Sequence, residues 1–187
     1  MASKITICNQ ALTMLGVGAI SGFDDLSAQA IACANLWDNV RDSVLRAGAW
    51  DCAVRRLEIS PLADEPLFEF GYKYALPDGC LRVLSITNDL RQADYQIEGR
   101  ELLCNESTIY LRYVARVEDP ALWDVGLRDV MAAAMAAELA YPLVREQAPI
   151  MRQEYMRRLQ EHRAIDGQQG TIARIPSGNA VKMRSMS

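Results

Sequence analysis

The chain has 187 residues, of which 50% are hydrophobic and 24% are charged, and its formal net charge is −4. This length suits one domain with a sizeable core, and a composition rich in Ala, Leu and Met favours helix. No apolar run approaches the roughly 20 residues of a membrane span, and the N-terminus lacks the apolar core of a secretory signal. We therefore expect a soluble protein that is synthesised in the cytoplasm.

The charge and the cysteines restrict the function further. Residues 1–125 have a net charge of −7 and residues 126–187 of +3, and the basic residues of 145–163 alternate with Glu at helical spacing, so no nucleic-acid-binding patch is predicted. The cysteines are odd in number and include no C-x-x-C pair, which predicts reduced thiols in the core instead of disulfides or a zinc site. They are Cys8, Cys33, Cys52, Cys80 and Cys104.

Two helices are predicted in the first half of the chain. The first spans about residues 4–15, with Ser3 as its N-cap and Gly16 just past its end. The second spans about residues 27–47, with Ser27 as its N-cap, and its apolar residues repeat at three and four, which predicts packing on one side. This apolar stripe contains Ala30, Cys33, Ala34, Trp37, Val40, Val44 and Leu45.

The pattern changes to that of strands over about residues 68–116. Aromatic and β-branched residues alternate, Asp78-Gly79 supplies a turn and a hairpin is predicted around residues 98–101. The segments with a strand pattern are 68–70, 72–74, 81–87, 95–97, 102–103 and 108–114. We interpret the region as a small antiparallel β-subdomain inserted between helices.

Helical patterns return in the last third of the chain. Asp119 followed by Pro120 predicts the start of an Ala-rich helix over about 120–141, and Pro142 and Pro149 are expected to break or kink the path. A last helix is expected over about 147–164. The predicted fold class is α+β, mainly α: a bundle of three to four helices with the β-subdomain over 1–166, and an extended, flexible C-terminal tail over 167–187.

No catalytic, metal-binding or cofactor-binding set of residues is expected. His162 is the only histidine and lies in a charged helix end, so we interpret it as a surface or rim residue instead of a general base. Three pairs of adjacent carboxylates are interpreted as caps of turns and helix starts: Asp24-Asp25, Asp64-Glu65 and Glu118-Asp119. The tryptophans are expected in the core instead of stacking on nucleic acid: Trp37, Trp50 and Trp123.

Five segments occur in an order and spacing that point to a known family. They are Ile7-Cys8-Asn9-Gln10-Ala11-Leu12 with Leu15-Gly16, Leu36-Trp37-Asp38 with Val40-Arg41-Asp42, Ala47-Gly48-Ala49-Trp50-Asp51, Tyr72 to Leu84, and Ala137 to Leu143. Over most of residues 4–165 the chain thereby resembles the head-to-tail adaptors of tailed bacteriophages, including the tail tubular protein A type of short-tailed phages. The segment Tyr-Ala-Leu-Pro-Asp at 74–78 is the most specific part of this resemblance.

The resemblance implies a non-enzymatic protein at the head–tail junction of the virion, synthesised in the bacterial host cytoplasm. It implies a ring of about twelve copies below the portal protein, which extends the DNA exit channel and provides a platform for a tail nozzle or other tail component. Double-stranded DNA would pass through without sequence-specific binding, and no cofactor or membrane is involved. The β-subdomain is expected to face the lateral neighbour or the next tail component.

Two sets of contact residues are predicted. The tail is expected to dock on the portal by adding a strand to it or by filling a groove of it. The candidate docking residues are Ile172, Arg174, Ile175 and Val181. The alternative, that the tail is a disordered terminus without a role, stays open. Residues of mixed sign are expected to set the register of lateral subunit contacts: Arg145, Arg152, Glu154 and Arg157. The alternatives are a connector or head-completion protein of a long-tailed phage, a small hydrolase or nuclease, and a host regulatory protein that binds DNA.

Overall fold

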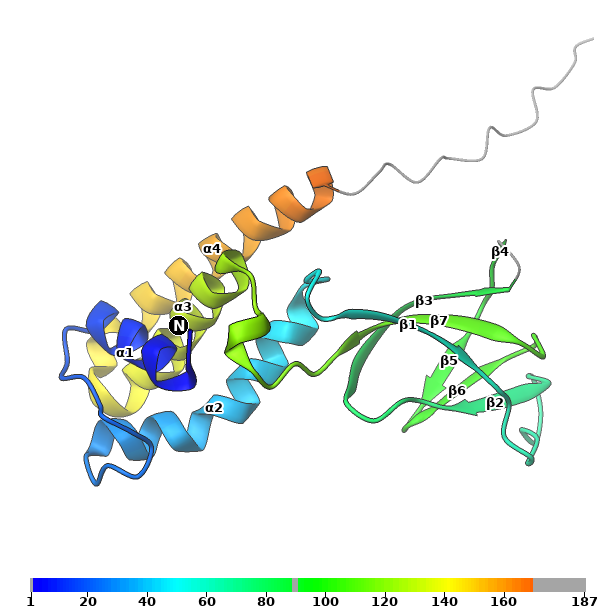
Figure 1. Cartoon of the computed structure of the whole chain (residues 1–187), viewed down its shortest axis with the longest axis horizontal. Helices are drawn as coiled ribbons and strands as arrows, with labels where there is room; N and C mark the ends of the chain where they lie inside the picture. Colours follow the sequence, from blue (N-terminus) through cyan, green and yellow to red (C-terminus); the bar gives the residue numbers. More distant parts are fainter. Residues whose placement is uncertain (1, 89–90, 170–187) are drawn as a thin grey trace, which may run out of the picture.

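The structure is a computed structural model that describes the backbone of residues 2–88 and 91–169. It shows an α+β fold with a helical bundle at one end and two small antiparallel sheets at the other (Figure 1), so the predicted fold class is confirmed. The bundle consists of α1 (Lys4–Met14), α2 (Ala28–Ala47), α3 (Val125–Leu143) and α4 (Ala148–Gln169). Residues 167–169, expected in the tail, belong to α4, and the rest of the predicted tail lies outside the described residues.

The β region is inserted between α2 and α3. Its strands are β1 (Val54–Ile59), β2 (Tyr72–Ala75), β3 (Cys80–Asn88), β4 (Arg91–Gln92), β5 (Gln96–Glu98), β6 (Glu101–Cys104) and β7 (Ile109–Ala115). One sheet has the order β1-β7-β3-β4 and the other β2-β6-β5. Buried side chains of both sheets form a second core cluster, which includes Tyr74, Ile86, Leu102 and Leu111.

One predicted strand was wrong, and two strands of the structure were not predicted. Phe68–Phe70 is not a strand, because no other strand pairs with it, and its Phe68 side chain is 77% exposed. Strand β1 was missed, since four of its six residues are exposed and the sequence VRRLEI lacks a clear alternation. The very short β4 was missed as well.

The third and fourth helices also differ from the prediction at their ends. Asp119 caps only a 3-10 turn, η1 (Pro120–Leu122), whereas α3 begins at Val125 with Asp124 as its N-cap. Pro149 lies in the first turn of α4, where a missing backbone N–H costs least, whereas Pro142 lies in the last turn of α3, which ends one residue later. The direction of the chain changes between them, at η2 (Arg145–Gln147).

Helix α3 occupies the centre of the bundle and contacts α1, α2 and α4 (Figure 1). Its residues from Val130 to Ala137 are all nearly or fully buried, and five of these eight are alanine. Small side chains let three neighbouring helices approach the same central helix closely. The Ala-rich run of the sequence is therefore the residue pattern of a central helix.

The tryptophans lie in the core, as predicted. Trp37, Trp50 and Trp123 are 2%, 2% and 3% exposed. The indole N–H of Trp50 donates to the Val44 carbonyl at 3.0 Å, and that of Trp123 donates to the Val117 carbonyl at 3.1 Å. The rings of Trp50 and Trp123 thus pack in the core while their N–H groups bond backbone carbonyls six residues earlier in the chain.

The cysteines are free thiols, and Cys8, Cys33 and Cys104 are buried, as predicted, whereas Cys52 and Cys80 are only half-buried. Cys8 of α1 faces Cys33 of α2, and a hydrogen bond with Cys33, together with burial, raises the pKa of the Cys8 thiol. The cysteines of α1 and α2 therefore serve helix packing.

One residue of the predicted apolar stripe of α2, Ala34, is exposed instead of buried.

Asn9 connects α1 to the loop that leads to α2. Its side-chain amide donates to the Ile20 carbonyl at 3.0 Å and accepts from the Ile20 N–H at 2.8 Å. We expect Asn9→Ala to lower the free energy of unfolding by about 1–3 kcal/mol, because it leaves two backbone groups beside a buried residue without partners. Urea denaturation measures this loss. Gln10→Ala on the exposed side of α1 is the control, and an equal loss in both variants would contradict the assignment.

Candidate functional site

The predicted lateral-contact residues on α4 are already paired within that helix. Arg157 donates to Glu154 at 2.8 and 2.9 Å and to Glu161 at 2.5 Å, and Arg158 donates to Glu154 at 2.6 Å. These hydrogen bonds lower the pKa of Glu154 to about 2. The charges of this helix face are therefore compensated inside one copy of the chain.

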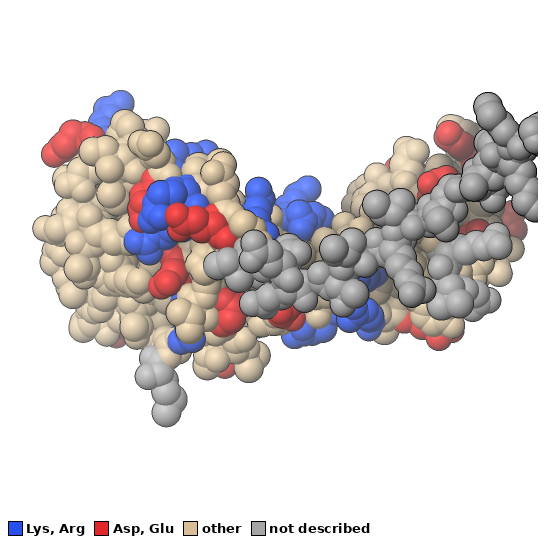
Figure 2. All heavy atoms as spheres, turned by 90° about the horizontal axis from the view of Figure 1, so that it is seen from above, with Lys and Arg blue, Asp and Glu red and all other residues tan. Residues whose placement is uncertain are grey.

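The other two predicted residues lie nearer the start of α4. Arg152 donates to Glu138 of α3 at 3.3 Å, and Arg145 is exposed in the η2 turn. Figure 2 shows Lys/Arg and Asp/Glu side chains next to one another on the bundle. Exposed pairs of this kind add little affinity, so a lateral contact through them stays a prediction and would need apolar surface beside it.

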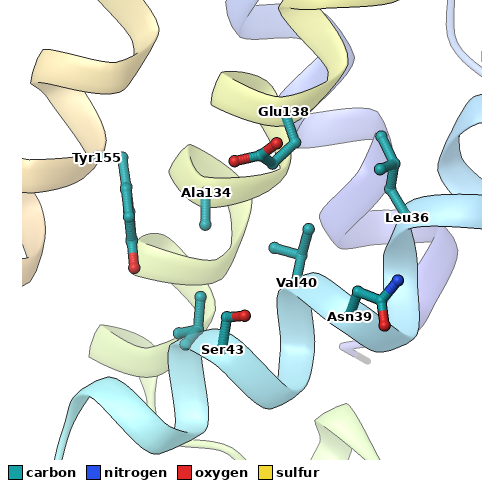
Figure 3. Close-up of a pocket in the computed structure, with 8 residues that line it drawn as sticks. Leu36, Asn39, Val40, Ser43, Ala134, Glu138 and Tyr155 are labelled. Carbon is teal, nitrogen blue, oxygen red and sulfur yellow. The ribbon is translucent and has the colours of Figure 1, made fainter.

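A groove of about 340 Å³ lies between α2, α3 and α4 (Figure 3). Its lining residues are Leu36, Asn39, Val40, Ser43, Val44, Ala134, Glu138 and Tyr155. The floor is apolar and nearly inaccessible, whereas the α2 side chains Asn39 and Ser43 are exposed at the rim. The sequence contains no local signal for this groove, because its walls come from three different helices and the whole β region separates α2 from α3 and α4.

Three arginines gather where α2 ends and the β region begins; we call Arg46, Arg82 and Arg163 the arginine cluster. Arg163 donates to the Ala47 carbonyl at 2.5 Å, and Arg82 donates to the adjacent Gly48 carbonyl at 3.0 Å. Burial, and then the charges of Arg163 and Arg46, lower the pKa of Arg82. Among the side chains that the structure describes, no carboxylate forms an ion pair with any of the three.

The arginine cluster and the groove adjoin. Ser43 of the groove lies three residues before Arg46 on α2, so the two side chains share a helix face. On α4, Arg163 is close enough to Tyr155 for its charge to affect the Tyr155 hydroxyl. At the other side of the groove, Glu138 is neutralised by Arg152. The groove therefore combines an apolar floor with one positively charged end.

His162 packs inside the molecule more closely than its predicted rim position suggests. The centroid of its ring lies 6.3 Å from that of the Trp50 ring, and a Cβ atom on Gly126 would clash with its Nδ1. Helix α4 continues past it to Gln169, so it is not at the helix end. Burial raises the pKa of the half-buried Cys52 thiol, which is opposite to the shift that an activated nucleophile needs.

The predicted capping role holds for two of the three carboxylate pairs. Asp25 accepts from the Ser27 N–H at 3.0 Å and Asp119 accepts from the Ala121 N–H at 2.9 Å. Asp64 instead forms an ion pair with Lys73 at 3.1 Å. Asp64 thereby fixes the base of a loop and does not cap a helix.

The predicted tail contacts lie outside the described residues: Ile172, Arg174, Ile175 and Val181. Over the described part of the chain, no group of three or more His, Cys, Asp or Glu residues is arranged to hold a metal ion, and no helix is long and apolar enough to cross a membrane. Compared with protein-family models and with curated proteins, the chain matches none.

Proposed function

We propose that the chain is a structural head-to-tail adaptor of a tailed bacteriophage, which forms a ring of about twelve copies at the head–tail junction. The ring extends the DNA channel below the portal protein and holds a tail nozzle or other tail component. In this proposal residues 170–187 dock on the portal, and DNA passes through without sequence-specific contact. The proposal starts from the ordered segments over residues 4–165 that resemble this family.

The residues of these segments hold the bundle and the β region together, which supports the resemblance. Asn9 fastens the α1–α2 connection, and Trp50 closes the end of α2. Asp42 of α2 binds Arg116, which follows β7. The segments therefore contain residues that position one half of the molecule relative to the other.

The observation that carries the proposal is the separation of two different exposed surfaces. In the β region, Leu67 and Phe68 are 98% and 77% exposed, whereas in the bundle the arginine cluster and the groove face solvent beside exposed polar residues of α2. The first surface lies at the far end of the β region, whereas the second lies on the bundle, with the arginine cluster where α2 meets the β region (Figure 1). A closed ring of identical subunits needs two unlike surfaces of this kind on every copy, because each contact joins different faces.

The experiment is a mass measurement of the full chain, alone and mixed with the portal ring encoded by the same phage genome. We expect the mixture to form a particle that contains one portal ring and about twelve copies of this chain. A chain that ends at Gln169 is expected to leave the portal free, which tests the docking role of the terminal residues. Particles without a fixed number of bound copies, or no complex at all, would contradict the proposed function.

A further inference from the structure

The loop of residues 64–70 is an exposed segment with both apolar and acidic side chains. It lies at the end of the β region that is farthest from the bundle (Figure 1). Leu67 and Phe68 are 98% and 77% exposed, and the flanking Glu65 and Glu69 are exposed as well. Two large apolar side chains held in water by one loop are typical of a contact surface.

The local structure of this loop fixes its conformation beside β2, β5 and β6. The Phe70 N–H donates to the Phe68 carbonyl at 2.9 Å across Glu69, whose φ is +73°, which is the strained form of a γ-turn. At its base Lys73 binds Asp64 at 3.1 Å, and the Gly71 N–H donates to the Asn105 side chain at 2.8 Å. Contacts on both sides of the turn therefore maintain a conformation that the isolated segment would avoid.

The groove between α2, α3 and α4 has the complementary properties. Val40, Val44 and Ala134 form an apolar floor, and the arginine cluster supplies positive charge at one end without a carboxylate partner among the described side chains. Arg82 also has a buried Nε atom without a hydrogen-bond partner in this part of the chain. Two apolar side chains flanked by two carboxylates match this surface in polarity and in sign of charge.

We propose that the loop of residues 64–70 of one copy docks in the α2/α3/α4 groove of the neighbouring copy. Leu67 and Phe68 cover the apolar floor, and Glu65 and Glu69 face the arginine cluster. A copy cannot fill its own groove, because its loop lies at the far end of the β region, away from the bundle (Figure 1). This inference rests on the proposed ring, in which each copy gives one surface and receives another.

The C-terminal residues 170–187 are the alternative occupant of the groove. They include Arg174, Lys182 and Arg184 and no Asp or Glu, so their charge has the same sign as that of the arginine cluster. Like charges placed together oppose docking, whereas the acidic loop lowers the electrostatic energy of the same surface. The charge of the groove therefore favours the loop of a second copy.

The first test uses full-length variants that each remove one surface. Leu67→Asp with Phe68→Asp removes the apolar loop side chains, and Ser43→Trp fills the groove. We expect each variant alone to lose rings under the conditions in which the wild type forms them. A mixture of the two is expected to form 1:1 dimers in sedimentation, because one intact loop and one intact groove remain.

The matched controls are Leu26→Asp, which changes another exposed apolar residue, and Ala34→Trp, which adds the same ring to an exposed position elsewhere on α2. Both controls are expected to assemble like the wild type. Circular dichroism of every variant shows that loss of assembly is not loss of folding. Rings that persist in the loop variant or in the groove variant would overturn the docking proposal.

The second test does not need a ring. The full-length groove variant, which keeps an intact loop and carries benzophenone in place of Phe68, is irradiated together with the full-length loop variant, and the cross-links between the two copies are mapped by mass spectrometry. We expect cross-links to the groove residues of α2 and α3 of the loop variant, and about fivefold fewer when Glu65 and Glu69 of the benzophenone-carrying copy are lysine. Absence of cross-links in the groove overturns the docking proposal.

The two tests separate this inference from the proposed function. Groove cross-links with a wild-type chain that forms no ring, alone or with the portal, would support the docking contact and contradict the adaptor ring. Rings that form while the groove stays unlabelled would support the adaptor and contradict the docking contact.

Discussion

Replacing Trp37 with alanine is expected to lower the free energy of unfolding by about 3–5 kcal/mol. Trp37 of α2 is 2% exposed. Its ring stacks on Trp123 with centroids 6.1 Å apart and planes within 4°, and it contacts the Phe23 ring at 6.2 Å. Alanine would leave a cavity between α2, the start of α3 and the α1–α2 loop, and these elements cannot all move to fill it.

Trp37→Phe separates the effect of ring volume from that of the indole N–H. Among the described residues, the Trp37 Nε1 atom has no hydrogen-bond partner, so phenylalanine breaks no bond and is expected to recover a large part of the loss. Leu26→Ala, at a side chain that is 91% exposed, is expected to change stability by less than about 0.5 kcal/mol. Denaturant unfolding measures all three. A loss below about 1.5 kcal/mol for Trp37→Ala would contradict a rigid, well-packed junction.

The second large effect is expected at Asp42, which connects the bundle to the sheet. Arg41 donates to its carboxylate at 2.9 Å, and Arg116 donates two hydrogen bonds at 3.0 Å and one at 2.5 Å. Arg41 is only 5% exposed, so Asp42→Ala leaves a buried guanidinium with one fewer partner. We expect a loss of about 2–3 kcal/mol in the free energy of unfolding.

Asp38→Ala is the matched control for Asp42→Ala. Asp38 also accepts from Arg41, at 2.7 Å, but its side chain is 73% exposed. Water can replace an exposed carboxylate, so the expected loss is at most about 1 kcal/mol. Equal losses at the two positions would show that Arg41 alone, and not the bridge to Arg116, is stabilised by these carboxylates.

The Asp42 contribution is also expected to depend on pH. Burial alone would raise the pKa of Asp42, but hydrogen bonds from Arg116 and Arg41 outweigh burial and lower it below the ordinary value of 3.8. The stabilisation is therefore complete above pH 3.8 and is lost as the pH falls through the lower pKa of the folded state. The stability difference between the wild type and Asp42→Ala should shrink in that acidic range, and a constant difference would contradict the ion pairs.

The starts of α1 and α2, the α+β class and the core tryptophans followed from the sequence, because their signals are local. Ser3 and Ser27 accept hydrogen bonds from Thr6 and Ala30, as expected of N-cap residues. Gly16, with a φ of +68°, lies just past the end of α1, where a left-handed residue ends a helix. Such features depend on residues within one helical turn of one another.

The tertiary structure alone decided which segments pair and which surfaces meet. The sequence VRRLEI lacks a strand alternation but becomes β1 because β7 lies beside it, whereas Phe68–Phe70 alternates and remains a loop. The ordered segments of the resemblance pointed to a phage adaptor, but they contain no sign of the groove or of the complete arginine cluster. The groove and the arginine cluster form when α2, α3, α4 and β3 pack together. A sequence pattern within one of these elements contains no information on its contacts with the other three.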